Sequence, residues 1–342
     1  MGNMKYGVLI ESIYSPSELV SIARQVEDRG FSHFWYPDEK FFKDCYIGLS
    51  LVAQHTQSIA LGPCVTDPYS RHPIMTAAAI ASLAEVAPNR TWLGIGAGGR
   101  GFQAIGVERN RPAIAIREAV FIIRELLAGK MVDYQGEVIC LNDRSLDFTP
   151  TEQVPIMIAT GYGHLVQSLA GEIGDAVMLA NISSPQMILA ALENVKKGVN
   201  KSGRNLSDIY MILRVDVAVN PDKSAAKRVV APIILSAMRA SYPGLAYLDE
   251  LPDFEMSSKF LKVLGKNDYK SRSFYRDPEN SAPLIPSELY ENLAIVGEPD
   301  EVREKIKKII DLDVFNEITI RPVPAGEQTI LKCIDVIYEV LI

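Results

Sequence analysis

The stretch 61-LGPCVTDPYSRHP-73 separates an apolar run of strand length, Ser58–Leu61, from a helical pattern that begins at Pro73. It therefore reads as the connection inside one strand–helix unit. The connection is irregular, because Pro63 and Pro68 bracket a β-branched Val-Thr pair and proline cannot donate a hydrogen bond to a sheet. We expect the regular strand to end at Leu61 and an unusual backbone to follow it.

The same alternation of strand and helix extends along the chain in both directions. Short apolar runs rich in Val, Ile and Leu predict buried strands. Eight such runs occur, and the strands are expected at Tyr6–Ile10, Ser32–Tyr36, Ser58–Leu61, Thr91–Ile95, Pro155–Ala159, Ala176–Leu179, Ile209–Val217 and Glu317–Ile320.

A helical pattern follows each strand, often with proline in its first turn. These helices are expected at Pro16–Arg29, Asp44–Thr56, Pro73–Val86, Pro112–Ala128, His164–Glu172, Pro185–Val199, Lys223–Ala240 and Gln328–Val340, with one more at Asp300–Ile310. Eight strand–helix units in 342 residues predict an α/β fold of the (β/α)₈ or TIM-barrel type. A doubly wound sheet is the alternative, although such a sheet rarely needs eight units.

Two segments interrupt the rhythm. Residues 131–154 alternate around Gln135-Gly136 and predict a small surface hairpin. Residues 241–286 hold several prolines, aromatic side chains and mixed charges, which predicts an insertion after the seventh strand and its helix. We expect one domain, 1–342, in which 241–286 forms a lid over the pocket and excludes water.

Composition excludes several classes of protein. Hydrophobic residues make up 48% of the chain, the net charge is −7, and basic residues form no stripe of the kind that binds nucleic acid. No apolar stretch reaches membrane-spanning length, and the N-terminus does not resemble a signal peptide. The four cysteines are scattered, as in reduced cytoplasmic proteins, and the four histidines lack metal-ligand spacing.

Carboxylates follow the first two predicted strands. In a barrel of this type the active site lies at the carboxyl ends of the strands, so residues there are candidates for chemistry. Glu11 follows the first strand, and Asp38 and Glu39 follow the second. Carboxylates at such a site can act as acid or base. Polar strand ends, a helix cap or a solvated turn would explain the same residues equally well.

Glycine-rich turns follow the fourth and fifth strands. The first, 94-GIGAGGRG-101, holds five glycines in eight residues and lets the backbone approach a flat ring or an anion. The second, 159-ATGYGHL-165, leads directly into a helix N-terminus, which favours phosphate. Ala180 and Asn181 follow the sixth strand. A flexible loop or close packing of helix on sheet are the alternatives for these turns.

Four of these stretches together carry a resemblance to a known family. They are 60-ALGPCVTDPYSRHPIMTAAAIASLAE-85, 90-RTWLGIGAGG-99, 155-PIMIATGYGHLVQSLAGEIGDAVML-179 and 288-ELYENLAIVGEPDEV-302. The chain resembles the bacterial-luciferase-like oxidoreductases from about Met4 to about Pro322. Within them it is most similar to the branch that uses coenzyme F420, a deazaflavin, and there to the methylenetetrahydromethanopterin reductases.

The resemblance implies a barrel that binds a flavin or deazaflavin at the strand ends. It implies a cis peptide bond at Cys64-Val65, in a bulge that backs the ring. The turn Gly161–His164 would hold the phosphate. The full set of implied cofactor-binding residues is Pro63, Cys64, Val65, Thr66, Gly96, Ala97, Gly98, Gly99, Ala159, Thr160, Gly161, Tyr162, Gly163, His164 and Ala180.

The chain departs from the family's pattern at two positions. Glu39 stands where the family has a histidine after its strand-two aspartate, here Asp38, so any protonation role belongs to a carboxylate. Leu9 stands where the methanopterin reductases carry a glutamate, and the carboxylate nearest to it along the chain is Glu11. Asp38, Glu39 and Glu11 are therefore the catalytic candidates.

Three functions remain open at this stage. The first is a coenzyme F420-dependent oxidoreductase that transfers a hydride to or from a small organic substrate, with Arg71, His72 and Arg100 meeting an anionic cofactor tail. The second is an FMN-dependent monooxygenase on the same barrel. The third is a non-catalytic flavin-binding protein. In each case we expect a homodimer or higher homo-oligomer and no metal, nucleic acid or membrane partner.

Overall fold

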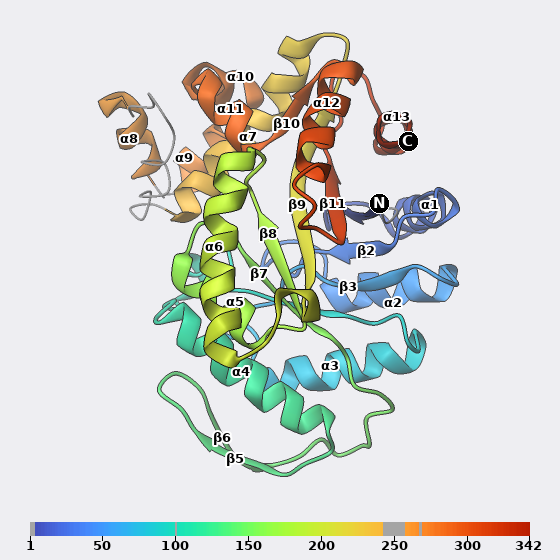
Figure 1. Cartoon of the computed structure of the whole chain (residues 1–342), viewed down its shortest axis with the longest axis vertical. Helices are drawn as coiled ribbons and strands as arrows, with labels where there is room; N and C mark the ends of the chain where they lie inside the picture. Colours follow the sequence, from blue (N-terminus) through green and yellow to red (C-terminus); the bar gives the residue numbers. More distant parts are fainter. Residues whose placement is uncertain (1–3, 100, 242–256, 267–268) are drawn as a thin grey trace.

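The computed structural model describes residues 4–99, 101–241, 257–266 and 269–342 (Figure 1). Eight parallel strands form the predicted (β/α)₈ barrel, in the order β3-β2-β1-β11-β9-β8-β7-β4. They are β1 (Lys5–Leu9), β2 (His33–Tyr36), β3 (Ala60–Pro63), β4 (Leu93–Ile95), β7 (Ile156–Thr160), β8 (Ala176–Ala180), β9 (Tyr210–Val219) and β11 (Glu317–Pro322).

Helices connect successive strands and pack outside them, as the sequence predicted. They are α1 (Pro16–Asp28), α2 (Cys45–His55), α3 (Pro73–Val86), α4 (Pro112–Leu127), α5 (His164–Ile173), α6 (Pro185–Ser202), α7 (Lys223–Ser241), α12 (Pro299–Ile310) and α13 (Ile330–Leu341). Short 3₁₀ turns lie at Gln103–Ile105, Leu206–Asp208 and Ala282–Leu284.

Helix α1 shows why these segments fold locally as they do. Ser15 caps its N-terminus in a capping box with Glu18, and Pro16 occupies the first turn. The buried face carries Leu19, Ile22, Ala23 and Val26, which recur at helical spacing. Cap, proline and apolar stripe therefore agree on where the helix begins and which side it buries.

Strand β3 begins and ends two residues later than the sequence indicated. The carboxylate of Glu27, on α1, accepts hydrogen bonds from the backbone N–H groups of Gln57, Ser58 and Ile59. Those donors are consumed before the ladder with β2 begins at Ala60. The apolar run alone could not reveal this, because the competing acceptor lies on another element.

The barrel closes between β3 and β4. Two bridges join them, Leu61 with Thr91 and Thr66 with Ile95. The second bridge lies five residues further along the β3 side but only four along the β4 side, so the β3 side carries one extra residue, which makes a bulge. The Cys64-Val65 peptide bond in this bulge is cis, which confirms the expectation from the resemblance.

The barrel interior is built in layers. An apolar layer fills its middle, and it consists of Leu9, Trp35, Met157, Ala176, Met178 and Ile212. Toward the amino ends of the strands, the buried carboxylate of Glu317 pairs with His33 and accepts a hydrogen bond from Thr319. Burial alone would raise the pKa of Glu317, but His33 and the hydrogen bonds outweigh burial and hold this pKa below its usual value.

The predicted hairpin is present, and short helices follow α7. The hairpin consists of β5 (Val132–Gln135) and β6 (Cys140–Arg144), which lie beyond α3 and α4 in Figure 1. After α7 come α8 (Ser258–Leu264), α9 (Tyr269–Phe274), α10 (Pro278–Ser281) and α11 (Ser287–Leu293). Residues 242–256 and 267–268 of the predicted lid lie outside the described residues.

The structure contains one strand that the sequence did not predict. β10 (Ile295–Gly297) pairs in parallel with β9 but is not one of the eight strands of the barrel. It is only three residues long and wholly buried, so it shows no alternation that a pattern could detect. Among the described residues, no helix combines the length and the apolar composition that crossing a membrane requires.

The seam between β3 and β4 yields a stability prediction. A Cβ on Gly94 would lie 2.1 Å from the backbone oxygen of Pro63, which cannot move without opening the seam. Gly94→Ala should therefore lower the free energy of unfolding by about 1–3 kcal/mol, measured by urea denaturation. Gly99→Ala is the control, because a Cβ there meets nothing within 4 Å. Equal stabilities of the two variants would contradict the packing constraint.

Candidate functional site

The bulge after β3 lies directly on the apolar layer of the barrel. Cys64 and Val65 pack against that layer, and the Cys64 sulfur lies 3.5 Å from the sulfur of Met178. Burial raises the pKa of the Cys64 thiol to about 12, although the positive charge of Arg214 acts in the opposite direction. Cys64 is thus a packing residue rather than a nucleophile, and the bulge offers an apolar surface.

Asp67 organises the loop that follows the bulge. Its buried carboxylate accepts hydrogen bonds from the backbone of Tyr69 and Ser70 and forms an ion pair with Lys40 at 2.8 Å. Lys40 belongs to the loop after β2, and its ammonium also lies 3.8 Å from the ring centre of Phe102, in the loop after β4. These contacts join the loops that follow β2, β3 and β4.

The glycine-rich turn after β4 borders the bulge. A Cβ on Gly96 would lie 3.0 Å from a methyl group of Val65 and 3.2 Å from the backbone oxygen of Ala159. Gly98 has a positive φ of 70°. The structure therefore brings together three groups of predicted cofactor residues, from the ends of β3, β4 and β7.

The turn after β7 ends at an uncapped helix. Gly163 is the N-cap of α5, and no side chain caps the first backbone N–H groups of this ten-residue helix. The Tyr162 hydroxyl donates to the backbone oxygen of Asn181 at 2.7 Å, and the Gln167 side chain donates to that of Gly161. The turn is thus fixed against β8, where Ala180 lies near Gly161, while the N–H groups of the α5 N-terminus remain available to an acceptor.

A network of charged side chains joins the carboxyl ends of β1 and β11 to the middle of β9. Arg321 pairs with Glu11 and with Asp216, and Arg214 pairs with Asp216 and donates to the Asn181 side chain. Only Glu11 and Asn181 of this network were noted from the sequence. The signal was present, because two charges interrupt the buried strand 213-LRVDV-217, and in a barrel strand such residues face the interior.

The remaining residues singled out from the sequence lie in the loops after β2 and β3, and most of their contacts are with other parts of the protein. Asp38 forms an ion pair with Arg71 at 3.1 Å, which ties the loops after β2 and β3 to each other. His72 caps α3, since its Nδ1 accepts from the backbone of Ile74 and its Nε2 lies 3.0 Å from the backbone oxygen of Cys140. Glu39 is half-buried beside Asp38. Arg100 lies outside the described residues.

Buried polar atoms without a partner gather near these strand ends. Seven such side-chain atoms occur in the part of the chain that the structure describes. Four of them belong to Thr66, Thr160, Ser184 and Arg214. Thr66 and Ser184 follow β3 and β8, Thr160 ends β7, and Arg214 lies within β9 opposite Ala180, the last residue of β8. Buried polar groups normally have partners, so this concentration fits a polar ligand at the carboxyl ends of the strands.

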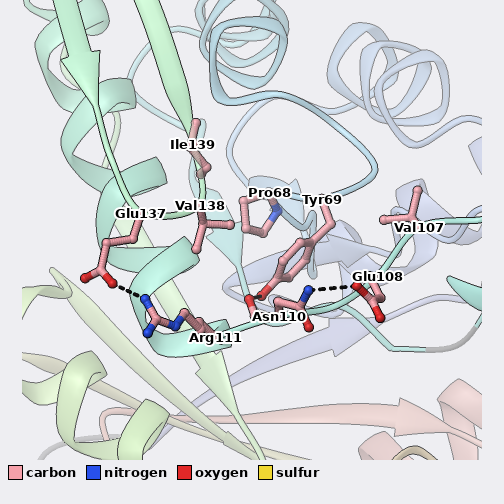
Figure 2. A pocket seen from close by; sticks show the side chains of 9 residues that line it. All are labelled: Pro68, Tyr69, Val107, Glu108, Asn110, Arg111, Glu137, Val138 and Ile139. Atoms are coloured by element: carbon pink, nitrogen blue, oxygen red, sulfur yellow. Dashed lines mark hydrogen bonds and ion pairs between the residues drawn. The ribbon is translucent and has the colours of Figure 1, made fainter.

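A surface cavity of about 700 Å³ lies to one side of this region (Figure 2). It is lined by Pro68 and Tyr69 after the bulge, by residues 107–111, and by residues 137–139 of the hairpin. The Tyr69 hydroxyl donates to the backbone oxygen of Asn110 at 2.7 Å. None of the predicted site residues lines this cavity, so the strand ends remain the better candidate for chemistry.

Comparison with known proteins identifies relatives over nearly the whole chain. The family model described as luciferase-like monooxygenase matches residues 4–314. A 5,10-methylenetetrahydromethanopterin reductase of Archaeoglobus fulgidus is 29% identical over 333 residues, 97% of each chain. An F420-dependent glucose-6-phosphate dehydrogenase of Mycobacterium avium is 30% identical over 66% of this chain and 72% of its own.

A solved structure shows the same fold. The coenzyme F420-dependent tetrahydromethanopterin reductase of Methanopyrus kandleri superposes with a TM-score of 0.81 at 23% sequence identity. The match covers 97% of both chains. The two chains therefore share the barrel fold over nearly their whole length.

The Lys40–Asp67 pair yields a prediction about the loops. The side chains of Lys40 and Asp67 are only 8% and 2% exposed, so removing one charge leaves the other buried and unpaired. Lys40→Met should cost about 3–5 kcal/mol of folding free energy, measured by chemical denaturation. The double variant Lys40→Met/Asp67→Asn should recover most of this loss. A cost below 1 kcal/mol for Lys40→Met would show that the pair does not hold the loops.

The pKa of Cys64 yields a labelling prediction. With a pKa near 12, roughly one thiol in ten thousand is ionised at pH 8, and the thiolate is the reactive form. Iodoacetamide at pH 8 should therefore modify the exposed Cys140 first and leave Cys64 unmodified, as measured by peptide mass spectrometry. A Cys140→Ser variant controls for the assignment. Rapid labelling of Cys64 in that variant would indicate a reactive thiol.

Proposed function

Because this chain belongs to the luciferase-like monooxygenase family, we propose that it is an oxidoreductase that uses coenzyme F420 to transfer a hydride to or from a small organic substrate. The observation that carries the proposal is the bulge at Cys64-Val65 on the apolar layer of the barrel, bordered by glycine-rich turns. A flat ring needs such a surface. The F420-dependent dehydrogenase that matches 66% of this chain and the F420-dependent reductase that shares its fold support the deazaflavin as the ring.

Each group of residues has a distinct part in this proposal. Pro63–Thr66 would support one face of the ring, while Gly96–Gly99 would leave space along its edge. The residues of Ala159–His164, with Ala180, would surround the side chain of the cofactor. Bound there, the deazaflavin supplies a carbon that accepts or donates a hydride.

The N-terminus of α5 is the proposed phosphate site. Its first N–H groups lack a side-chain cap, and the helix dipole favours negative charge at this end. Thr160, whose buried hydroxyl has no protein partner, lies just before the turn. The helix end fits a negative charge on the side chain of the cofactor, and the Thr160 hydroxyl fits a neighbouring hydrogen-bond acceptor.

The carboxylates divide into two classes. Asp38 and Glu11 each form an ion pair with an arginine. We assign them to positioning those arginines. Glu39, in the place of the family's histidine, is the proposed group that holds or moves a proton at the substrate. The segment 241–286 remains the proposed lid that excludes water from the hydride.

Two other functions give different experimental results. An FMN-dependent monooxygenase would bind FMN tightly and would need oxygen, whereas a deazaflavin reductase would work without oxygen. A non-catalytic flavin-binding protein would bind cofactor but would be indifferent to Asp38→Asn and Glu39→Gln in every reaction tested. The first alternative is supported by the description of the family model.

Assembly and location remain predictions. The chain is expected to form a homodimer or higher homo-oligomer in the cytoplasm. Helices α2 and α3 pack against each other, and each exposes a large apolar side chain, Ile47 at 75% and Met75 at 59%. This pair of helices is the surface at which we expect two copies to meet.

A cofactor titration tests the proposed function. Purified protein should bind coenzyme F420, followed by its fluorescence, at least tenfold more tightly than FMN. Thr160→Val should weaken F420 binding by roughly twofold to tenfold, the worth of one hydrogen bond to a neutral donor. Thr91→Val is the matched control, because Thr91 is also buried but donates to the backbone oxygen of Ala87 at the amino end of β4, the opposite end of the barrel from Thr160.

The outcomes separate the alternatives. Tight FMN binding without F420 binding would support the monooxygenase and contradict the proposal. If Thr160→Val and Thr91→Val weakened F420 binding equally, Thr160 would not belong to the cofactor site. The proposal that the cofactor is F420 would still stand.

A further inference from the structure

Arg214 holds an unusual place in the barrel. It follows Ile212 by two residues on β9, so both side chains face the interior, and it lies opposite Ala180 of β8. Ile212 belongs to the apolar layer on which Cys64 and Val65 rest. Arg214 is therefore one layer above that surface, and its charge acts on the Cys64 thiol, against the larger effect of burial on that pKa.

The neighbours of Arg214 neutralise its charge and fix its orientation. One terminal nitrogen donates to the Asp216 carboxylate and the other to the side-chain oxygen of Asn181. Asp216 also binds Arg321, which in turn binds Glu11. Two arginines and two carboxylates carry no net charge together, so burying them does not require an anionic ligand.

One donor of Arg214 remains unsatisfied. The residue is only 7% exposed, and its Nε atom is buried without a hydrogen-bond partner. A guanidinium has five N–H donors in a fixed plane, so the two terminal contacts also fix the direction of the Nε–H group. An unpaired buried donor of a charged group is costly, and a bound acceptor would remove that cost.

We propose that the Arg214 Nε–H group binds a carbonyl oxygen of the pyrimidine ring of the deazaflavin, and that Asp216, Arg321 and Glu11 are positioning residues that hold Arg214 in place. The inference rests on the proposed function and adds the residue that recognises the ring. The level of Arg214 relative to the bulge favours the ring over the substrate as the source of the acceptor. Arg214 would also sense the oxidation state of the cofactor.

The redox argument follows from charge. Hydride addition brings two electrons and one proton to the ring, so the ring gains one negative charge, which its carbonyl oxygens share. A hydrogen bond from a charged donor is stronger to an acceptor that carries more negative charge. Arg214 should therefore bind the reduced cofactor more tightly than the oxidised one and raise its reduction potential.

Binding of both redox forms tests this inference without any substrate. Coenzyme F420 is titrated anaerobically into wild type and Arg214→Gln, in its oxidised and its chemically reduced form. We expect the Kd to rise roughly fifteenfold for the oxidised and roughly 150-fold for the reduced form, the range that one charge-assisted hydrogen bond provides. This tenfold difference corresponds to a midpoint potential lower by about 30 mV for the bound two-electron couple.

Two further variants separate recognition from folding. Arg214→Lys keeps the charge but lacks the Nε–H group, so both forms should bind more weakly while the ratio of their Kd values changes less than threefold. Arg214→Gln leaves the Asp216 charge buried without its partner, which could prevent folding. Arg214→Gln/Asp216→Asn removes both charges, so we expect this double variant to fold and to be available for the same titration. Arg204→Gln is the control, because it removes an arginine of the same barrel whose guanidinium donates to the backbone oxygen of Gly174 at the amino end of β8, away from the proposed ring site.

The results can contradict the inference and the proposed function separately. Failure of wild-type protein to bind F420 in either form would overturn the proposed function and the inference with it. Normal binding by wild type, with Arg214→Gln and the double variant unchanged for both forms, would overturn the inference alone. Equal weakening of both forms in Arg214→Gln would also overturn the redox claim.

Discussion

The close approach of β3 and β4 is the constraint on which the rest of the structure depends. The barrel has one seam where strands are joined by two bridges rather than by a continuous ladder. Glycines at 62 and 94 make it possible, because a Cβ at either position would lie 2.1 Å from a backbone oxygen of the opposite strand. The seam accommodates one extra residue on the β3 side, and that residue produces the bulge.

The bulge in turn determines where the candidate site lies. It places Cys64 and Val65 on the apolar layer and leaves Thr66 with a buried, unpaired hydroxyl. The loop beyond it is anchored by Asp67, whose ion pair with Lys40 connects it to the loop after β2. A surface for a flat ring, a polar border and a fixed loop thus follow from the way the barrel closes.

Buried charged side chains at the two ends of the barrel differ in their hydrogen-bond partners. At the amino ends, the carboxylate of Glu317 is satisfied by His33, Ser32 and Thr319, which suits a structural role. At the carboxyl ends, the charges of Arg214 and Asp216 are balanced, yet the Arg214 Nε–H group is left over. His33 Nε2 is also buried without a partner at the amino ends, but four of the seven such atoms among the described residues lie toward the carboxyl ends, which supports these ends as the binding side.

The sequence by itself determined the barrel, the hairpin, the irregular connection after the third strand and the glycine turns, because periodicity, proline and glycine act on neighbouring residues. The cis bond at Cys64-Val65 and the cofactor class came from the family resemblance. Only the tertiary structure decided that Glu27 delays β3, that β10 joins β9, and that Glu11 meets Arg321, 310 residues away. Such partners are set by barrel closure, and no local pattern encodes which distant strands become neighbours.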